Sequence, residues 1–385
     1  MGRFHDALAA PGLGAIAEVK RRSPSAGDLR PDADPAALAA QFARRGAAAI
    51  SILVDERFGG SIDDLRAART ATAAPLLAKG FFTSEAELEE LREAGADAAL
   101  LLLRDLDDGR AAALLLHARR LGLDALVEAH DGDELQRALR LDAAVIGVNA
   151  RDLSSFEIDR RAQLELVGRA PRDRVVVAES GIHTRAQGAA AELAGADAIL
   201  VGSALMLAPD PPARLEEILS RPLVKICGMT RQNDVDAAVE AGADMIGFVF
   251  AEGSPRRAPE VLSVPDNRLS VGVFVGEAED VGSDLVQLYP RENGRVRGRD
   301  AALLREGEQV ARVVDLPWGE DDPLHLQRAA AVEGRVMLAG RLGPDNVRAA
   351  VEAVQPWAVD AVSRLEAAPG IKDREKVRAF VAAAR

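Results

Sequence analysis

Short apolar runs alternate with amphipathic stretches along the first half of the chain. Eight such runs fall within about 190 residues, at 15–19, 48–54, 75–78, 98–103, 124–127, 143–148, 174–178 and 198–201. The segments between them, such as 85–94 and 186–194, carry apolar residues at helical spacing. Continuous apolar strands that alternate with helices are typical of a parallel sheet buried on both faces, and eight units close a barrel. The pattern predicts a (βα)₈ barrel.

A repeated joint supports this prediction. The tetrapeptide Ala-Gly-Ala-Asp occurs at 94–97, 194–197 and 241–244, each time directly before an apolar run. A glycine that ends a helix just before a strand is what a series of βα units requires. We therefore expect helix-to-strand transitions at all three places.

The second half carries a similar but shorter series. Its apolar runs lie at 224–227, 245–250, 271–275, 285–288, 310–314, 336–339 and 357–362. The roughly 163 residues after 222 fall below the ~200 usual for such a barrel. Residues 301–305 and 310–314 flank a Glu-Gly-Glu turn, which favours a β-hairpin where a strand-helix-strand unit is expected. The fold class is therefore α/β, with two tandem (βα)₈ TIM barrels over 1–219 and 222–385, the second shortened and open to distortion.

Composition narrows the class of protein. The chain has 48 Lys and Arg against 61 Asp and Glu, a net charge of −13 and no concentrated basic patch, which argues against nucleic-acid and membrane partners. It has no apolar run of 18 residues and no signal peptide, and its single cysteine excludes a disulfide framework or a cysteine-rich zinc site. We expect a cytoplasmic protein without metal or cofactor. Because only the short segment at 220–222 joins the halves, the two barrels should pack on each other.

Lysine is rare in this chain. The 48 basic residues include only five lysines, Lys20, Lys79, Lys225, Lys372 and Lys376. Arginine cannot replace an ammonium group as a proton donor near neutral pH. A retained lysine is therefore a candidate for proton chemistry.

Polar residues stand where the strands of the first half end. They are Lys20, Asp55, Lys79, Arg104, Glu128, Asn149, Glu179 and Gly202. In a (βα)₈ barrel these ends meet at one mouth, where active sites are built, although loops are polar in any protein. Glu18 and Lys20 are two residues apart on one strand, so both can face the interior. Alternating charges around one mouth suit acid–base work on an anionic substrate.

Two glycine turns follow the last two strands of the first half. They are Glu-Ser-Gly-Ile at 179–182 and Val-Gly-Ser-Ala at 201–204. Glycine next to small hydroxyl residues lets backbone N–H groups approach an anion, which predicts a phosphate site. The alternative is that these glycines serve only tight turns.

Seven ordered motifs resemble indole-3-glycerol-phosphate synthase over about residues 4–218. They include Glu-Val-Lys-Arg-Arg-Ser-Pro-Ser (18–25), Leu-Leu-Ala-Lys (76–79), Leu-Val-Glu-Ala-His (126–130) and Ile-Gly-Val-Asn-Ala-Arg (146–151). The family converts carboxyphenylamino-deoxyribulose phosphate to indole-glycerol phosphate with loss of CO₂ and water. The resemblance implies that Lys79 is the general acid of ring closure and Glu128 the partner acid or base in dehydration.

The same resemblance implies further site residues. Glu18, Lys20, Asn149, Glu179 and Ser180 would line the substrate, with Lys20 near the departing carboxylate. Ser23, Gly181, Gly202 and Ser203 would hold the phosphate, and Arg151 would support the rim. Two departures stand out: Gly80 replaces the aspartate that usually follows the catalytic lysine, and only about fifteen residues precede the first strand instead of about forty.

The second half resembles phosphoribosylanthranilate isomerase over roughly residues 222–385. The motifs include Val-Lys-Ile-Cys-Gly-Met-Thr (224–230), Gly-Ser-Pro-Arg-Arg (253–257) and Pro-Gly-Ile-Lys-Asp (369–373). The resemblance implies an Amadori isomerisation with Cys227 as base and Asp315 as acid, and substrate or phosphate contacts from Arg256, Gly340 and Ser363. By composition alone, a lone cysteine is more often a buried apolar residue.

Several family features of the isomerase are replaced. The glycine-rich loop after the aspartate is Leu-Pro-Trp-Gly-Glu-Asp-Asp (316–322), Gln-Leu-His-Gly is Gln-Leu-Tyr-Pro (287–290), and Ser-Ser-Gly is Val-Ser-Arg (362–364). Three hypotheses follow: a bifunctional enzyme of tryptophan biosynthesis acting on phosphorylated small molecules, a synthase with a decayed second barrel, and a non-catalytic protein that binds phosphate ligands. The set Lys79, Glu128 and Glu179 argues against the third hypothesis, because simple binding does not need it.

Overall fold

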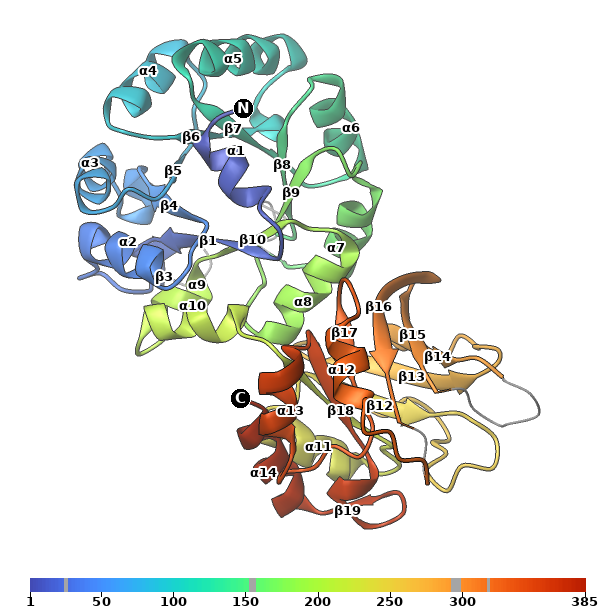
Figure 1. The fold of residues 1–385 in the computed structure, drawn as a ribbon. Helices are drawn as coiled ribbons and strands as arrows, with labels where there is room; N and C mark the ends of the chain where they lie inside the picture. Colours follow the sequence, from blue (N-terminus) through green and yellow to red (C-terminus); the bar gives the residue numbers. More distant parts are fainter. Residues whose placement is uncertain (24–26, 152–156, 292–298, 317–318) are drawn as a thin grey trace. The chain divides into compact units, whose positions relative to one another are not determined.

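The computed structural model describes residues 1–23, 27–151, 157–291, 299–316 and 319–385. It divides into two compact units, one formed by Met1–His183 with Gly188–Leu219 and the other by Thr184–Gln187 with Ser220–Arg385. Each unit contains one closed barrel of eight strands (Figure 1). The prediction of two barrels in one chain is confirmed.

All strands of the first barrel are parallel, in the order β1-β10-β9-β8-β7-β6-β5-β4. They are β1 (Gly14–Val19), β4 (Ala49–Leu53), β5 (Leu76–Lys79), β6 (Ala98–Leu102), β7 (Asp124–Ala129), β8 (Val145–Asn149), β9 (Val175–Glu179) and β10 (Ala198–Val201). Each apolar run of the first half corresponds to one of these strands. Two short strands, β2 (Arg22–Ser23) and β3 (Gly27–Asp28), pair antiparallel beside β1 in the chain.

A helix follows each strand of the first barrel after its loop. These helices are α2 (Pro35–Arg44), α3 (Ile62–Ala71), α4 (Glu85–Glu93), α5 (Asp108–Leu121), α6 (Gly132–Arg140), α7 (Arg160–Arg169), α8 (Arg185–Ala194), α9 (Ser203–Met206) and α10 (Pro211–Leu219), with the 3₁₀ turns η1 (Glu56–Phe58) and η2 (Leu103–Asp105). Ser61 and Ser84 begin α3 and α4 with capping boxes, in which Asp64 and Glu87 reach back to the cap N–H. The local sequence thus fixes where these helices start.

The repeated Ala-Gly-Ala-Asp joint has one structural role at all three places. Its glycine has a positive φ, from 92° to 114°, which ends the helix. Its aspartate then accepts an N–H from the first or second residue of a neighbouring strand: Asp97 from Leu76 at 2.9 Å, Asp197 from Val176 at 2.8 Å, and Asp244 from Val224 at 2.9 Å. The joint therefore ends a helix and ties adjacent strands together at the start of the barrel.

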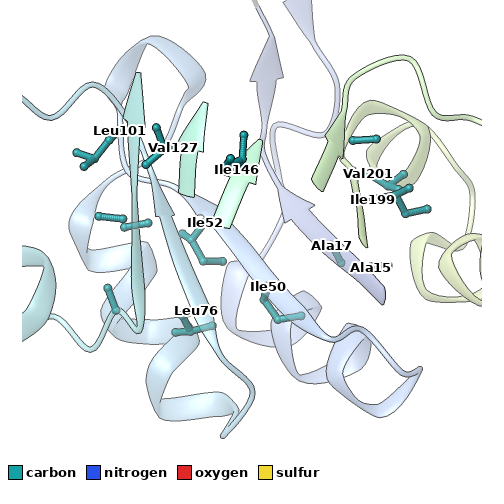
Figure 2. Close-up of a cluster of buried hydrophobic side chains, with 14 of the residues drawn as sticks. Ala15, Ala17, Ile50, Ile52, Leu76, Leu101, Val127, Ile146, Ile199 and Val201 are labelled. Carbon is teal, nitrogen blue, oxygen red and sulfur yellow. The ribbon is translucent and has the colours of Figure 1, made fainter. Parts of the chain in front are cut away.

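Apolar side chains fill the first barrel in two layers. Those that point outward from the strands, among them Ile50, Leu76, Val127 and Ile199, lie under the helices (Figure 2). Those that point inward, such as Ile16, Leu126 and Val177, form a second cluster inside the barrel. Alternation along each strand produces both layers.

The segment before β1 packs against the inner layer. Helix α1 (Arg3–Leu8) places Phe4 and Leu8 in that cluster, and both are fully buried. The Asp124 carboxylate accepts the backbone N–H groups of Gly2 and His5 at 2.8 and 3.0 Å. Short as it is, this segment packs against the N-terminal ends of the barrel strands.

The second barrel has the strand order β11-β12-β13-β14-β15-β16-β17-β18. The strands are β11 (Leu223–Cys227), β12 (Met245–Val249), β13 (Leu269–Val275), β14 (Leu285–Tyr289), β15 (Ala301–Arg305), β16 (Glu308–Val314), β17 (Val336–Leu338) and β18 (Ala358–Ala361). Its helices are α11 (Gln232–Ala241), α12 (His325–Ala330), α13 (Val347–Val354) and α14 (Arg374–Ala384), with η3 (Ser363–Leu365) and a small hairpin of β19 (Glu366–Ala368) and β20 (Ile371–Lys372). No helix in the described ranges of the chain is long and apolar enough to cross a membrane.

The prediction of a β-hairpin in this barrel is confirmed. Strand β15 runs antiparallel to both β14 and β16, and Arg305 pairs with Glu308. The two turn residues between them, Glu306 and Gly307, have φ values of 51° and 84°, as a type I′ turn requires. The second half is a closed barrel of eight strands with the distortion that was expected, because a two-residue turn replaces a helical crossover and reverses one strand.

Candidate active site

Charged side chains form the layer above the apolar interior of the first barrel. Glu18, Lys79, Glu128 and Glu179 each stand two residues after an inward-facing apolar residue, respectively Ile16, Leu77, Leu126 and Val177. Because side chains alternate along a strand, all four face the interior near the C-terminal ends of the strands. The three carboxylates are at most 3% exposed. The structure thus brings together four charged groups that the sequence distributes over more than 160 residues.

Lys79 lies at the centre of this charged layer. Its Nζ is 2.6 Å from Glu179 Oε2, 3.4 Å from Glu18 Oε2 and 3.9 Å from Glu128 Oε2. The other oxygen of Glu18, Oε1, is 2.6 Å from Lys20 Nζ. A lysine among three carboxylates keeps its proton unless a stronger base is presented to it.

Glu128 is held by two neighbours on its Oε1 atom. Asn149 Nδ2 donates to that oxygen at 2.9 Å, and His130 Nε2 lies 3.1 Å from it. Glu128 Oε2 and Glu179 Oε1 are both buried and accept no hydrogen bond from the described residues. His130 was not among the predicted site residues, although its place two residues after Glu128 on one strand was a readable signal.

The surroundings separate the proton affinities of the two innermost carboxylates. Burial acts to raise the pKa of Glu128, but His130, Lys79 and Asn149 outweigh it and bring the pKa to about 2. Burial, together with the nearby charge of Glu128, raises the pKa of Glu179 to about 8 despite its contact with Lys79. The pKa of Lys79 is raised by the three carboxylates against the effect of burial. Carboxylates with separated pKa values are suited to different roles in proton transfer.

Glycines leave room for this layer. A Cβ at Gly147 would lie 2.1 Å from Glu179 Oε1, and one at Gly202 would lie 2.3 Å from Glu18 Oε1 and 2.9 Å from Lys20 Nζ. At Gly80 a Cβ would lie 2.8 Å from Cζ of Phe82. Glycine at position 80 therefore leaves room for the ring of Phe82 next to Lys79.

The predicted phosphate residues lie at the ends of β9 and β10. Ser180 and Gly181 both have φ of 69°, which brings their turn into the left-handed region. Gly202 precedes α9, whose first residue is Ser203. The structure places these two turns on adjacent strands, since β9 pairs with β10. For Gly202 it also supplies a second reason for glycine, namely room for the pair of Glu18 and Lys20.

Two further predicted residues lie on loops around this mouth. Ser23 ends β2 and is buried, and Arg151 follows β8, where its backbone N–H donates to Asn149 Oδ1 at 2.9 Å. Burial lowers the pKa of Arg151. Arg160, at the start of α7, donates to the Gly181 carbonyl at 3.2 Å, and burial lowers its pKa to about 10. Sequence reasoning did not select Arg160, because nothing in its local motif distinguishes it from other surface arginines.

Cys227 ends β11 and faces the interior of the second barrel. It is a free, buried cysteine, and burial raises the pKa of its thiol although the ammonium group of Lys225 acts to lower it. Lys225 is fully buried on the same strand two residues earlier. A Cβ at Gly247 would lie 2.5 Å from Sγ of Cys227, so this glycine makes room for the thiol.

Asp315 lies at the end of a buried hydrogen-bond chain. Lys225 Nζ donates to Asp360 Oδ2 and to Gln287 Oε1, both at 2.9 Å. Gln287 Nε2 donates to the Tyr289 hydroxyl, which donates to Asp315 Oδ2, both at 2.7 Å. We call this set of residues the interior chain; it connects the four strands β18, β11, β14 and β16. Tyr289 and Asp360 were not among the predicted site residues, although Tyr289 had been noted as the replacement of a histidine.

The remaining predicted residues of the second barrel lie at its loops. Arg256 pairs with Glu366 at 2.8 Å, Gly340 has φ of 93° beside Leu316, and Ser363 begins η3. The neighbouring Arg364 pairs with Asp345 at 2.7 Å. Residues 317 and 318 of the altered loop lie outside the described residues. Within the described ranges, no group of three or more histidine, cysteine or acidic residues has the arrangement of a metal site.

A (βα)₈ barrel with a lysine and three carboxylates at its mouth is the architecture of a barrel enzyme that moves protons. Residues 2–218 match the family model of indole-3-glycerol phosphate synthase, and the chain belongs to that family. Residues 322–383 match the model of N-(5'-phosphoribosyl)anthranilate isomerase. The chain therefore joins a synthase domain to an isomerase domain, and the region before 322, which holds the hairpin, lies outside the second match.

Some relatives match only one half of the chain, whereas one matches almost all of it. Indole-3-glycerol phosphate synthase 2 of Streptomyces coelicolor is 47% identical over 56% of this chain and 84% of its own length. A multifunctional tryptophan biosynthesis protein of Schizosaccharomyces pombe is 30% identical over 99% of this chain, which spans 61% of that protein. Among solved structures, phosphoribosyl anthranilate isomerase of Thermus thermophilus is 30% identical over 42% of this chain and 98% of its own, with a TM-score of 0.36.

Proposed function

We propose that the first barrel converts carboxyphenylamino-deoxyribulose phosphate to indole-glycerol phosphate, with Lys79 as general acid. The observation that carries this proposal is the position of Lys79 Nζ within 4 Å of Glu18, Glu128 and Glu179. An ammonium group held there can protonate the ketone oxygen as the aromatic carbon attacks the carbonyl. Lys20, fixed by Glu18, supplies a positive charge for the carboxylate that leaves as CO₂.

Dehydration follows on the same groups. The hydroxyl formed from the ketone oxygen leaves as water after a second protonation, and a base removes the proton from the adjacent carbon. The depressed pKa of Glu128 supports the base role for this residue, because the carboxylate is ionised at neutral pH. The raised pKa of Glu179, about 8, supports a role in holding or returning a proton beside Lys79.

The phosphate of this substrate is proposed to bind at the β9 and β10 ends. Backbone N–H groups of Gly181, Gly202 and Ser203, with the buried Ser23, would hold it. Asn149, Ser180 and Arg151 would line the rest of the substrate. The left-handed turn at Ser180 and Gly181 supports this assignment, since such turns direct backbone N–H groups outward.

We further propose that the second barrel isomerises phosphoribosylanthranilate, with Cys227 as base and Asp315 as acid. Both side chains end strands of one barrel and face its interior. An Amadori rearrangement needs one group that removes a carbon-bound proton and another that protonates the ring oxygen. Arg256, Gly340 and Ser363 are the proposed substrate and phosphate contacts. A synthase with a decayed second barrel remains the second candidate, favoured by the pairing of Arg364 with Asp345 beside the proposed phosphate turn.

Direct assay of the purified full chain tests both proposals. Each substrate is supplied separately, and indole-glycerol phosphate or the rearranged ketose is measured. Formation of indole-glycerol phosphate without isomerisation would leave the second candidate, and the absence of both reactions would leave a binding protein.

Two features of the whole chain are also proposed. The short joint at 220–222 supports packing of the two barrels on each other, which limited proteolysis at the joint would test.

The single free thiol and the biosynthetic family support a cytoplasmic location, which cell fractionation would test.

A further inference from the structure

His130 lies between two carboxylates at the end of β7. Its ring is mostly buried, with 13% of the side chain exposed. Its Nε2 is 3.1 Å from Glu128 Oε1, and its Nδ1 is 2.9 Å from Oε2 of Glu134 in α6. The same Glu134 oxygen accepts the backbone N–H of His130 at 2.8 Å. One carboxylate therefore fixes both the backbone and the ring of this histidine.

This geometry selects one protonation state of the ring. A neutral imidazole carries a proton on only one nitrogen, whereas here each nitrogen faces a carboxylate oxygen. The doubly protonated ring hydrogen-bonds to Glu134 through Nδ1 and places a positive charge at ion-pair distance from Glu128, where Nε2 lacks the alignment of a hydrogen bond. Burial alone would lower the pKa of His130, but Glu128 and Glu134 raise it to about 10. The other charges in these surroundings are Arg104, which acts on Glu134, and Lys79 and Glu179, which act on Glu128.

We infer that His130, as an imidazolium held by Glu134, is a positioning residue that turns Glu128 Oε2 toward the substrate and keeps the carboxylate ionised. Asn149 donates a hydrogen bond to Oε1, and His130 Nε2 lies at ion-pair distance from the same oxygen. Oε2 is the oxygen near Lys79 and accepts no hydrogen bond from the described part of the protein. The proton acceptor is therefore one defined oxygen of one side chain.

The inference rests on the proposed base role of Glu128 and extends it to residues outside the barrel interior. Glu134 lies in the first turn of α6, which starts two residues after His130, so the strand-loop-helix unit carries the whole arrangement. Because the imidazolium favours the charged form of Glu128, its removal raises the pKa of that carboxyl group. Activity then falls on the acid side at a higher pH than in the wild-type enzyme.

The test compares His130→Gln with His117→Gln in the full chain. His117 is a matched control, because its Nε2 lies 3.1 Å from a carboxylate, Glu89, on the outer helices. We expect His130→Gln to lower kcat for indole-glycerol phosphate formation by about tenfold and to move the acid limb of the kcat profile up by about one pH unit or more. KM should change by less than about twofold, because the substrate contacts are retained. Glu134→Gln should give a smaller shift in the same direction.

Glu128→Gln distinguishes the proposed base role of Glu128 from the positioning role of His130. If Glu128→Gln keeps wild-type kcat, the proposed base role fails and the inference falls with it. If Glu128→Gln loses activity while His130→Gln keeps the wild-type acid limb, only the positioning role is overturned. A fall in kcat with an unmoved pH profile and a lowered Tm equally overturns it, since a purely structural residue would behave in that way.

Discussion

Each barrel has buried charged side chains in its interior, but the contacts that connect these side chains differ between the two barrels. In the first, Lys79 contacts three carboxylates, and two buried carboxylate oxygens accept no hydrogen bond within the described ranges. In the second, the interior chain from Asp360 through Lys225, Gln287 and Tyr289 leads to Asp315. The first arrangement leaves two carboxylate oxygens around one lysine without a hydrogen bond. The second leaves Oδ1 of Asp360 without one but links its other polar groups to one another.

This difference has a physical consequence. Buried polar groups that lack partners raise the free energy of the folded protein, so they persist where a substrate uses them. A buried network whose polar groups mostly hydrogen-bond to one another instead stabilises one arrangement of the core. The comparison predicts that substitutions in the first barrel mainly affect catalysis, whereas substitutions along the interior chain also affect the free energy of unfolding.

The largest effect is expected for Lys79→Arg. Arginine retains the positive charge but does not release a proton near neutral pH, so indole-glycerol phosphate formation should fall by roughly 10²–10⁴-fold. Isomerisation and Tm should stay at wild-type values. Steady-state kinetics of both reactions on one preparation measure this. A variant that retains more than about a tenth of wild-type turnover would remove Lys79 from the acid role.

Cys227→Ala and Asp315→Ala test the proposed base and acid of the second barrel. Each should lower isomerase turnover by about 10²-fold or more through loss of the base or the acid, with synthase activity unchanged. If Asp315→Ala keeps isomerase activity while Cys227→Ala loses it, the acid is another group. Asp360, which pairs with Lys225, and Asp284, which accepts the Ser270 N–H, would then be tested in the same way.

Lys225→Met tests the interior chain as a structural network. Without the ammonium group, Asp360 remains buried and unpaired, so the second barrel should lose about 3–5 kcal/mol of its free energy of unfolding. Denaturant unfolding of the full chain measures this. Lys376→Met is the control, because Lys376 is exposed. A loss of less than about 1 kcal/mol in Lys225→Met would contradict the structural role of the chain.

Ser203→Pro addresses the phosphate site of the first barrel. Proline at the first position of a helix is tolerated in conformation but lacks the N–H, so the KM of the synthase substrate should rise by roughly tenfold. Ser203→Ala separates the hydroxyl from the N–H. This substitution avoids Gly202, where any side chain would also collide with Glu18 and Lys20. An unchanged KM in Ser203→Pro would favour the alternative interpretation, in which Gly181 and Gly202 serve only tight turns and bind no phosphate.

The periodicity of apolar residues was sufficient to predict the strands of both barrels and the hairpin at 301–314. Local motifs selected Lys79, Glu128 and Glu179, because strand ends in a barrel converge whatever lies between them in the chain. Contacts that depend on side-chain direction were missed. His130 was quoted inside its motif but not selected. The interior chain depends on bonds from Gln287 to Lys225 and from Tyr289 to Asp315, which join different strands and which no spacing rule specifies. The reversal of β15 is the distortion of the second barrel that the Glu-Gly-Glu turn predicted.

The measurement that tests the central claim most directly is complementation of two tryptophan-requiring strains, one deficient only in the synthase and one only in the isomerase. The account predicts that the wild-type chain restores growth of both strains, that Lys79→Arg restores only the isomerase-deficient strain, and that Cys227→Ala restores only the synthase-deficient strain. Failure of the wild-type chain to restore the isomerase-deficient strain, with normal rescue of the other, would contradict two independent active sites and leave the second barrel without its proposed reaction.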